Sequence, residues 1–169
     1  LQNGHVSEPL PVRDNLNLLP GGPELELLSA PRPLRDALGS LPFDVFLFDC
    51  PPGHAALDCL ALEAADVVLA VCEPHRLGVA GAARVLDAAK DLRPDARAAV
   101  VVGRLDERRG LDRTAPDLLA GAFGLPVFPV RQDAALAGAL NAGQLPPAHG
   151  RAADDVGTIA AWIEGRKKA

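Results

Sequence analysis

The residues best suited to chemistry follow a short apolar run in the first third of the chain. Residues 45–48 are continuously hydrophobic, Asp49 follows them, and Pro51 and Pro52 stiffen the next turn. A buried strand that ends in a carboxylate is what a Mg²⁺–nucleotide site needs, because the strand fixes the carboxylate beside the water shell of the ion. Asp49 is therefore a candidate metal-binding and catalytic residue. The alternative is that Asp49 only ends a strand and caps the turn.

Cysteine and histidine offer a second kind of chemistry. A zinc site would have to draw on a scattered set: Cys50, His54, Cys59, Cys72 and His75. Their spacing matches no paired-cysteine framework, so we favour reduced and mostly buried thiols over a metal centre. His54 and Cys50 also lack an identifiable third group that would make them a nucleophile and its base.

Alternating strands and helices must position these residues. Apolar runs predict strands at residues 16–19, 45–48, 67–71, 98–102 and 126–130. Helical periodicity predicts helices at residues 35–41, 55–64, 78–92, 115–123, 134–142 and 152–163. This order favours an α/β fold with a doubly wound, mostly parallel sheet and helices on both faces. Ligands of such sheets bind beyond the carboxyl ends of the strands, here residues 49–53, 72–75, 103–113 and 130–133.

Composition narrows the classes of protein. The chain has 169 residues with 17 Lys and Arg against 22 Asp and Glu, a net charge of −5, which argues against nucleic-acid binding through bulk charge. No apolar run reaches the ~18 residues of a membrane span, and no signal-peptide pattern opens the chain. Three cysteines do not make a disulfide framework. We predict a cytoplasmic domain without a membrane partner.

Several segments, taken in order, resemble one family. The apolar run with Asp49 and the two prolines, the segment 64–71, Glu73-Pro74 and Gly78 are similar to the ParA/MinD-type deviant-Walker P-loop ATPases, closest to the ParA partition branch. Residues 14–20, 104–106 and 130–137 resemble further family segments. The resemblance implies a P-loop NTPase-like domain at residues 15–164, preceded by an irregular segment, 1–14, and followed by a basic tail, 165–169.

The resemblance also implies roles for single residues. Asp49 matches the Walker B acid that steadies the water shell of Mg²⁺, and Pro51 and Pro52 match the turn after it. Asp106 and Arg131 match loops that approach the nucleotide base and the dimer interface in the family. The implied cofactors are Mg²⁺ and ATP in the intact parent protein, and the implied partners are a second copy and a ParB-like protein.

Four arginines form a basic loop, which the resemblance makes a candidate for non-specific DNA binding: Arg104, Arg108, Arg109 and Arg113. The alternative is a solvated loop whose charges pair with Asp106, Glu107 and Asp112. The C-terminal helix region is too poor in apolar residues for a membrane-targeting helix, which argues against the MinD branch.

The Gly-rich phosphate-binding loop that the family carries near its N-terminus is not found in the sequence. The family has a Gly-rich loop with lysines, whereas the first Lys here is Lys90, and the prolines of the segment 20–23 remove N–H donors. The chain also has no Met and begins with Leu1. We therefore expect an N-terminally truncated, C-terminal part of a ParA-like ATPase for chromosome or plasmid partitioning, itself unable to hydrolyse ATP. Alternatives are a nucleotide-incompetent interaction module and another doubly wound nucleotide-binding domain.

Overall fold

The computed structural model describes residues 8–20, 34–39, 41–51 and 55–165. It divides into two compact units, residues 1–65 and residues 66–169. The first unit contains β1 (Leu10–Arg13), β2 (Leu16–Leu18), α1 (Leu34–Leu38) and α2 (Ala55–Ala64). The second contains β3 (Val67–Cys72), α3 (Arg76–Leu92), β4 (Arg97–Leu105), α4 (Gly110–Phe123), β5 (Val127–Arg131), α5 (Ala134–Asn141) and α6 (Arg151–Ile163).

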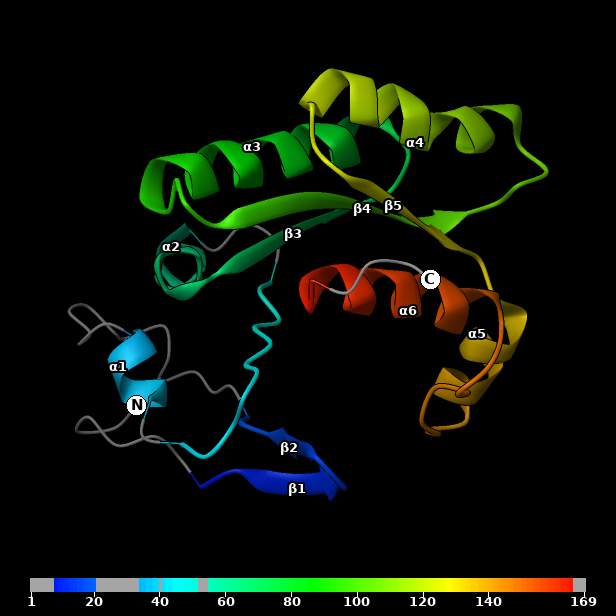
Figure 1. The fold of residues 1–169 in the computed structure, drawn as a ribbon. Coiled ribbons are helices and arrows are strands. Elements are labelled where there is room, and N and C mark those ends of the chain that lie inside the picture. The colour runs from blue at the N-terminus through cyan, green and yellow to red at the C-terminus, as the bar shows by residue number, and fades with distance from the viewer. Residues whose placement is uncertain (1–7, 21–33, 40, 52–54, 166–169) are drawn as a thin grey trace. The chain divides into compact units, whose positions relative to one another are not determined.

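A parallel sheet organises the second unit. Its described strands have the order β3-β4-β5, with Val67 opposite Arg97 and Val100 opposite Val127. Helices α3 and α4 lie on one face of this sheet and α6 lies on the other (Figure 1). The predicted α/β fold with a parallel sheet between helices is confirmed, and its last three strands lie within a few residues of the predicted ranges.

The core of this unit lies between the sheet and α3 and α4. The buried cluster consists of small and medium-sized side chains: Ala70, Cys72, Ala82, Val100, Val102, Leu105 and Leu119. On the opposite face of the sheet, Ala99 and Val101 are buried, as are Ala152 and Ile159 of α6. Because β4 is covered on both faces, its apolar residues form a continuous run, as parallel central strands do.

The start of α3 is fixed by His75 and Gly78. The Nδ1 atom of His75 accepts a hydrogen bond of 3.0 Å from the backbone N–H of Gly78, which satisfies one free donor of the helix start. A Cβ atom at Gly78 would lie 2.6 Å from the backbone oxygen of Glu73, so only glycine fits here. A glycine at position 78 is thus required by the close approach of the start of α3 to the backbone of Glu73.

The segment after β4 is shorter than the sequence predicted. A polar loop was expected over residues 103–113, but β4 continues to Leu105 and α4 begins at Gly110. The register between β4 and β5 shifts between Val102 and Leu105, as at a β-bulge, and β4 continues beyond this point. Arg104, within the irregular segment, has a φ of 59°. Pro116, which is typical of a first helical turn, lies well inside α4, so the helix start predicted at residue 115 was wrong.

The first unit departs most from the predicted parallel sheet. β2 pairs with β1 in an antiparallel hairpin, and β1 lies inside the segment 1–14. Residues 45–48 form no strand, and the exposed fractions of Val45 and Leu47 are 73% and 87%. The prediction of a strand covered on both faces was wrong because, among the described residues, no neighbouring strand supplies hydrogen bonds to this run.

Candidate functional site

Three loops meet at the carboxyl-end edge of the sheet in the second unit. They follow β3, β4 and β5, whose last residues are Cys72, Leu105 and Arg131. Parallel strands bring their carboxyl ends to one edge, where ligands of such sheets bind. The backbone N–H of Gln132 donates to the oxygen of Leu105 over 2.9 Å, which holds the second and third loops together.

Glu73 and Arg104 connect the loop after β3 to the end of β4. Nη1 of Arg104 donates to Oε1 of Glu73 over 2.9 Å, and Nε2 of His75 lies 3.8 Å from Oε2 of the same carboxylate. Arg104 holds a left-handed backbone conformation that non-glycine residues adopt at a cost, and such strain is concentrated at functional sites. The ion pair is exposed, so its contribution to stability is small and its main effect is to hold the loop after β3 against the end of β4.

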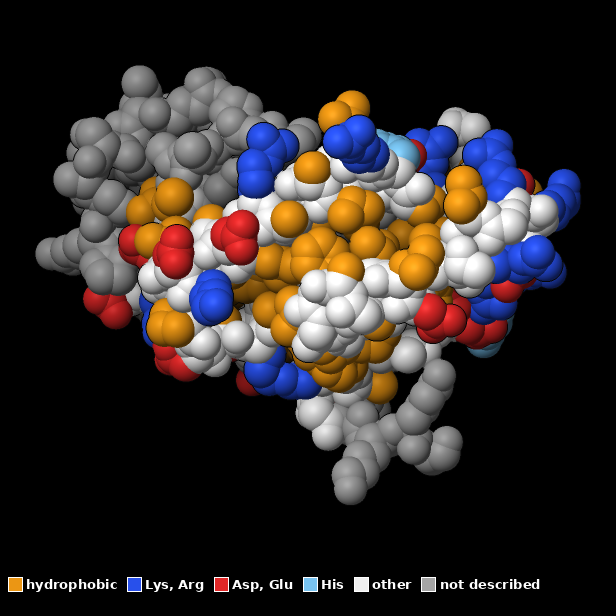
Figure 2. Space-filling view, turned by 90° about the horizontal axis from the view of Figure 1, so that it is seen from above, with side chains coloured by type: hydrophobic (Ala, Val, Ile, Leu, Met, Phe, Trp, Pro, Cys, Tyr) orange, Lys and Arg blue, Asp and Glu red, His pale blue; other side chains and the backbone are white. Residues whose placement is uncertain are grey.

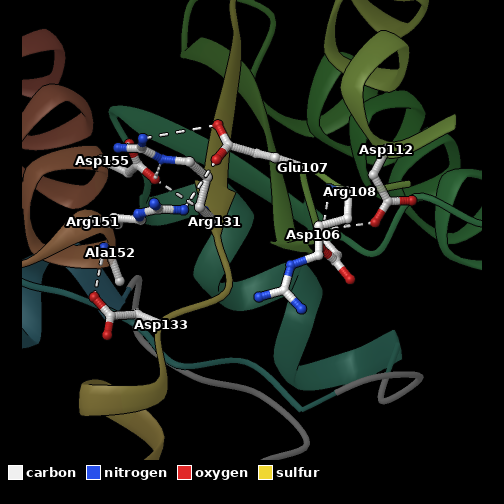
Figure 3. A network of polar contacts seen from close by, with 9 residues as sticks. All are labelled: Asp106, Glu107, Arg108, Asp112, Arg131, Asp133, Arg151, Ala152 and Asp155. Carbon is white, nitrogen blue, oxygen red and sulfur yellow. Dashed lines mark hydrogen bonds and ion pairs between the residues drawn. The ribbon is translucent and has the colours of Figure 1, made fainter. Parts of the chain in front are cut away.

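The loop after β4 is organised by two aspartates (Figure 3). The backbone N–H of Asp106 donates to Oδ2 of Asp112 over 2.9 Å, and Asp112 is 9% exposed. Oδ1 of Asp106 accepts from the backbone N–H of Arg108 over 3.1 Å, while its Oδ2 lies 3.8 Å from Nε of Arg109. Asp106 therefore uses much of its hydrogen-bonding capacity to shape its own loop.

Arg131, a predicted nucleotide-binding residue, is held by two carboxylates. Its backbone N–H and its Nε both donate to Oδ2 of Asp155 over 2.9 Å, and its Nη2 donates to Oδ1 over 2.8 Å. Its Nη1 lies 3.9 Å from Oε1 of Glu107, whose other oxygen accepts from Arg151 over 3.1 Å. The hydrogen bonds with Asp155 raise the pKa of Arg131 above its ordinary value. The guanidinium thus joins β5 to α6 and to the loop after β4.

Asp133 caps two helices at once, and Figure 3 shows its contact with Ala152 of α6. Its Oδ1 accepts from the N–H groups of Ala135 and Leu136 at the start of α5, and its Oδ2 accepts from Ala152 at the start of α6. These backbone donors, with Ala152 first, lower the pKa of the Asp133 carboxyl. Gly150 approaches so closely that a Cβ atom there would lie 2.8 Å from Oδ2.

Sequence patterns assigned no contact to Glu73, Asp133 or Asp155. They paired Glu107 with the arginines of its own loop, whereas its partners in the structure are Arg131 and Arg151. Asp133 was detectable, because an Asp directly before an apolar helical segment is a typical cap. Glu107 and Asp155 carry no local pattern, since their partners lie 44 and 24 residues away in the chain.

The arginines of the predicted DNA-binding loop fall into two groups. Arg104 and Arg109 have carboxylate neighbours, Glu73 and Asp106. For the side chains of Arg108 and Arg113, no ion pair exists with any described residue.

Asp49 lies in the first unit, where its side chain is exposed. Pro51 is exposed as well, and Pro52 lies outside the described residues. An exposed carboxylate fits Mg²⁺, which is usually held by one or two carboxylates together with waters and substrate phosphates. The only Lys among the described residues is Lys90, in the last turn of α3, so the described part of the chain shows no lysine at the carboxyl-end edge to hold phosphates.

Other candidate chemistry is limited in the residues that the structure covers. Within them, no three His, Cys, Asp or Glu side chains gather so that they could share a metal ion. His54, of the alternative zinc set, lies outside the described ranges. Burial raises the pKa of the Cys72 thiol, which disfavours its reactive thiolate form. None of the described helices has the length and apolar character to span a bilayer.

Comparison with known proteins finds a curated relative at significant similarity. No protein-family model matches the chain. The chain is 32% identical over 125 residues to the chromosome-partitioning ATPase Soj of Thermus thermophilus. The aligned residues cover 68% of this chain and 50% of Soj, so the match spans about half the length of that relative.

Proposed function

We propose that this chain, which belongs to the ParA-like ATPases, acts in the ATP-dependent partitioning of chromosomes or plasmids. The observation that carries the proposal is the alignment with a chromosome-partitioning ATPase over more than half of the chain. The three loops at the carboxyl-end edge of the sheet support it, because a parallel α/β sheet binds its ligand at that edge. The whole activity is proposed for the intact protein, with Mg²⁺ and ATP as cofactors.

Asp49 is proposed to hold the water shell of Mg²⁺, with Pro51 and Pro52 stiffening the turn that follows. Its support is the exposed carboxylate directly after an apolar run. The metal would neutralise charge on the phosphates, and Asp49 would fix the position of the metal.

Asp106 and Arg131 are proposed to border the nucleotide base. Both follow or end strands at the carboxyl-end edge, and both are held in defined positions by Asp112 and Asp155. The guanidinium of Arg131 already binds Asp155. We therefore assign Arg131 the role of positioning α6 and the loop after β4 beside the nucleotide, rather than of binding phosphate.

DNA association is proposed to use Arg108 and Arg113 most strongly, with Arg104 and Arg109 beside them. The first two have no carboxylate partner among the described residues, so their charge is available to phosphates. Two copies that combine on ATP would double this charge, and a ParB-like partner would stimulate release. We expect the protein in the cytoplasm and, while DNA is bound, on the nucleoid.

A second candidate function is an interaction module that binds no nucleotide. It is favoured by the described residues, which contain no Gly-rich loop with lysines that would hold phosphates. Under this alternative the same edge of the sheet would contact a protein and ATP would have no effect.

Sedimentation with plasmid DNA in the presence of Mg²⁺ and either ATP or ADP tests the proposal on the product of the complete gene. We expect DNA binding with ATP, weaker binding with ADP, and at least a severalfold loss in Arg108→Gln/Arg113→Gln. The matched control is Arg84→Gln, an exposed arginine in the middle of α3. DNA binding that does not depend on the nucleotide would contradict the partition function and favour the interaction module.

A further inference from the structure

Two exposed leucines occupy the same position in neighbouring helices. Leu77 and Leu111 are the second residues of α3 and α4, and each is 80% exposed. Both helices follow parallel strands of the same sheet and lie on the same face of it (Figure 1). Both leucines therefore stand at the carboxyl-end edge, beside the loops that form the candidate site.

Each leucine has an arginine close by in the chain that lacks a carboxylate partner. Arg76 directly precedes Leu77, and Arg108 lies three residues before Leu111. Neither arginine forms an ion pair with any residue in the described ranges, although the chain as a whole carries a net charge of −5. Figure 2, which views the side of α3 and α4, shows hydrophobic side chains standing among Lys and Arg side chains near the rim of this face. We call Arg76, Leu77, Arg108 and Leu111 the Arg–Leu surface.

The backbone that carries the Arg–Leu surface is fixed before any partner arrives. His75 caps the first turn of α3, and the Glu73–Arg104 ion pair joins the loop before α3 to the end of β4. Asp112 fixes the loop before α4 through the N–H of Asp106. A surface that is already ordered loses little conformational entropy on binding, which favours affinity.

We propose that the Arg–Leu surface binds an acidic peptide segment with apolar side chains, supplied by a partner protein. The arginines would pair with its carboxylates, and Leu77 and Leu111 would be buried against its apolar side chains. Binding of DNA would account for the unpaired arginines but not for the exposed leucines, because contacts with phosphates would leave both leucines in water. Each of the two helix starts offers an exposed leucine with an unpaired arginine one or three residues before it, which suits a ligand that carries both carboxylates and apolar side chains.

The test measures fluorescence anisotropy with the full chain and three labelled probes. The first is a peptide of about 15 residues rich in Glu and Leu, the second has the same charge with Ser in place of Leu, and the third is a DNA duplex of about 25 base pairs. We expect the native chain to bind the Leu-containing peptide about tenfold more tightly than the Ser-containing one, as burial of part of two leucine side chains predicts.

Two double variants separate the contributions. Leu77→Ser/Leu111→Ser should remove the preference for the Leu-containing peptide while leaving DNA binding within about twofold, and Arg76→Gln/Arg108→Gln should weaken binding of both peptides. The control is Leu140→Ser in α5, which is 57% exposed and distant in sequence from the surface. Far-UV circular dichroism checks that each variant is folded.

Three results would overturn the proposal. The first is equal binding of the two peptides to the native chain, or binding of neither. The second is loss of DNA binding in the leucine variant, which would assign the leucines to DNA. The third is a change of sedimentation coefficient in the leucine variant without a change in peptide binding, which would assign the surface to a second copy of the chain.

Discussion

Asp155 of α6 binds Arg131 of β5 through both the backbone and the side chain of the arginine. The carboxylate accepts the N–H and Nε of Arg131 on one oxygen and Nη2 on the other. Pro129, two residues earlier on β5, presents no N–H on the same side of the strand. The outer edge of β5 is thus closed to a further strand at both positions, and α6 is anchored there instead.

Asp155→Asn should destabilise the second unit. The amide replaces a carboxylate that is 12% exposed on its side chain and leaves donors of Arg131 facing an NH₂ group. We expect a loss of about 2 to 3 kcal/mol in the free energy of unfolding. Urea denaturation measures it, with Asp117→Asn, an exposed aspartate of α4, as the control. Equal midpoints for the two variants would show that the Arg131–Asp155 contact does not anchor α6.

Asp133→Asn should change the pH dependence of stability. Backbone donors lower the pKa of Asp133 in the folded state, so its stabilising effect is complete above the ordinary Asp pKa of about 3.9 and is lost as the pH falls through the folded value. The native chain should therefore exceed the variant in stability at neutral pH and lose that advantage below about pH 4. Urea midpoints of both proteins across this range measure the effect. An advantage that stays constant down to the lowest pH would contradict the role of Asp133 as an ionised cap.

Gly150→Ala should destabilise the chain, whereas Gly157→Ala should not. Gly150 has a φ of 135°, and a Cβ atom there would lie 2.8 Å from the Asp133 carboxylate. We expect a loss of about 1 to 3 kcal/mol from strain and the displaced cap. A Cβ atom at Gly157 inside α6 meets nothing within 4 Å, so alanine there should stabilise the helix by about 0.5 to 1 kcal/mol. Thermal melts compare the two variants, and shifts of the same sign would refute this account of the α6 start.

Sequence patterns predicted the second unit well because its elements carry strong periodicity. β4 is buried on two faces and therefore has a continuous apolar run, whereas α3 is buried on one face and has an amphipathic stripe. Both elements were predicted to within a few residues of their observed bounds. The run at residues 45–48 has the same composition as a buried strand but lacks a strand neighbour among the described residues. Composition alone does not distinguish a paired strand from such an unpaired run, because the hydrogen bonds of a strand depend on whether a second strand lies beside it.

The candidate site was predicted only in part for a related reason. Asp106 and Arg131 were predicted because they match loops of the family that the sequence resembles, and the structure brings these two loops to one edge of the sheet. Glu107 and Asp155 act through partners far along the chain, so only the fold shows what they hold. The close approach at Gly150 is likewise a consequence of α6 returning to the carboxyl end of β5.

Mg²⁺-dependent ATP binding in an Asp49→Ala variant tests the central claim most directly. Isothermal titration of the complete gene product with ATP, in Mg²⁺ and in EDTA, should show tight binding only with the metal. Asp49→Ala should lower the affinity in Mg²⁺ by about tenfold or more and leave the affinity in EDTA unchanged, because the carboxylate acts through the ion. Asp44→Ala, an exposed carboxylate at the other end of the same apolar run, should behave as the native protein does. Unchanged Mg²⁺-dependent binding in Asp49→Ala, or an equal loss in Asp44→Ala, would contradict the assignment of Asp49 as the metal-positioning residue of a ParA-like ATPase.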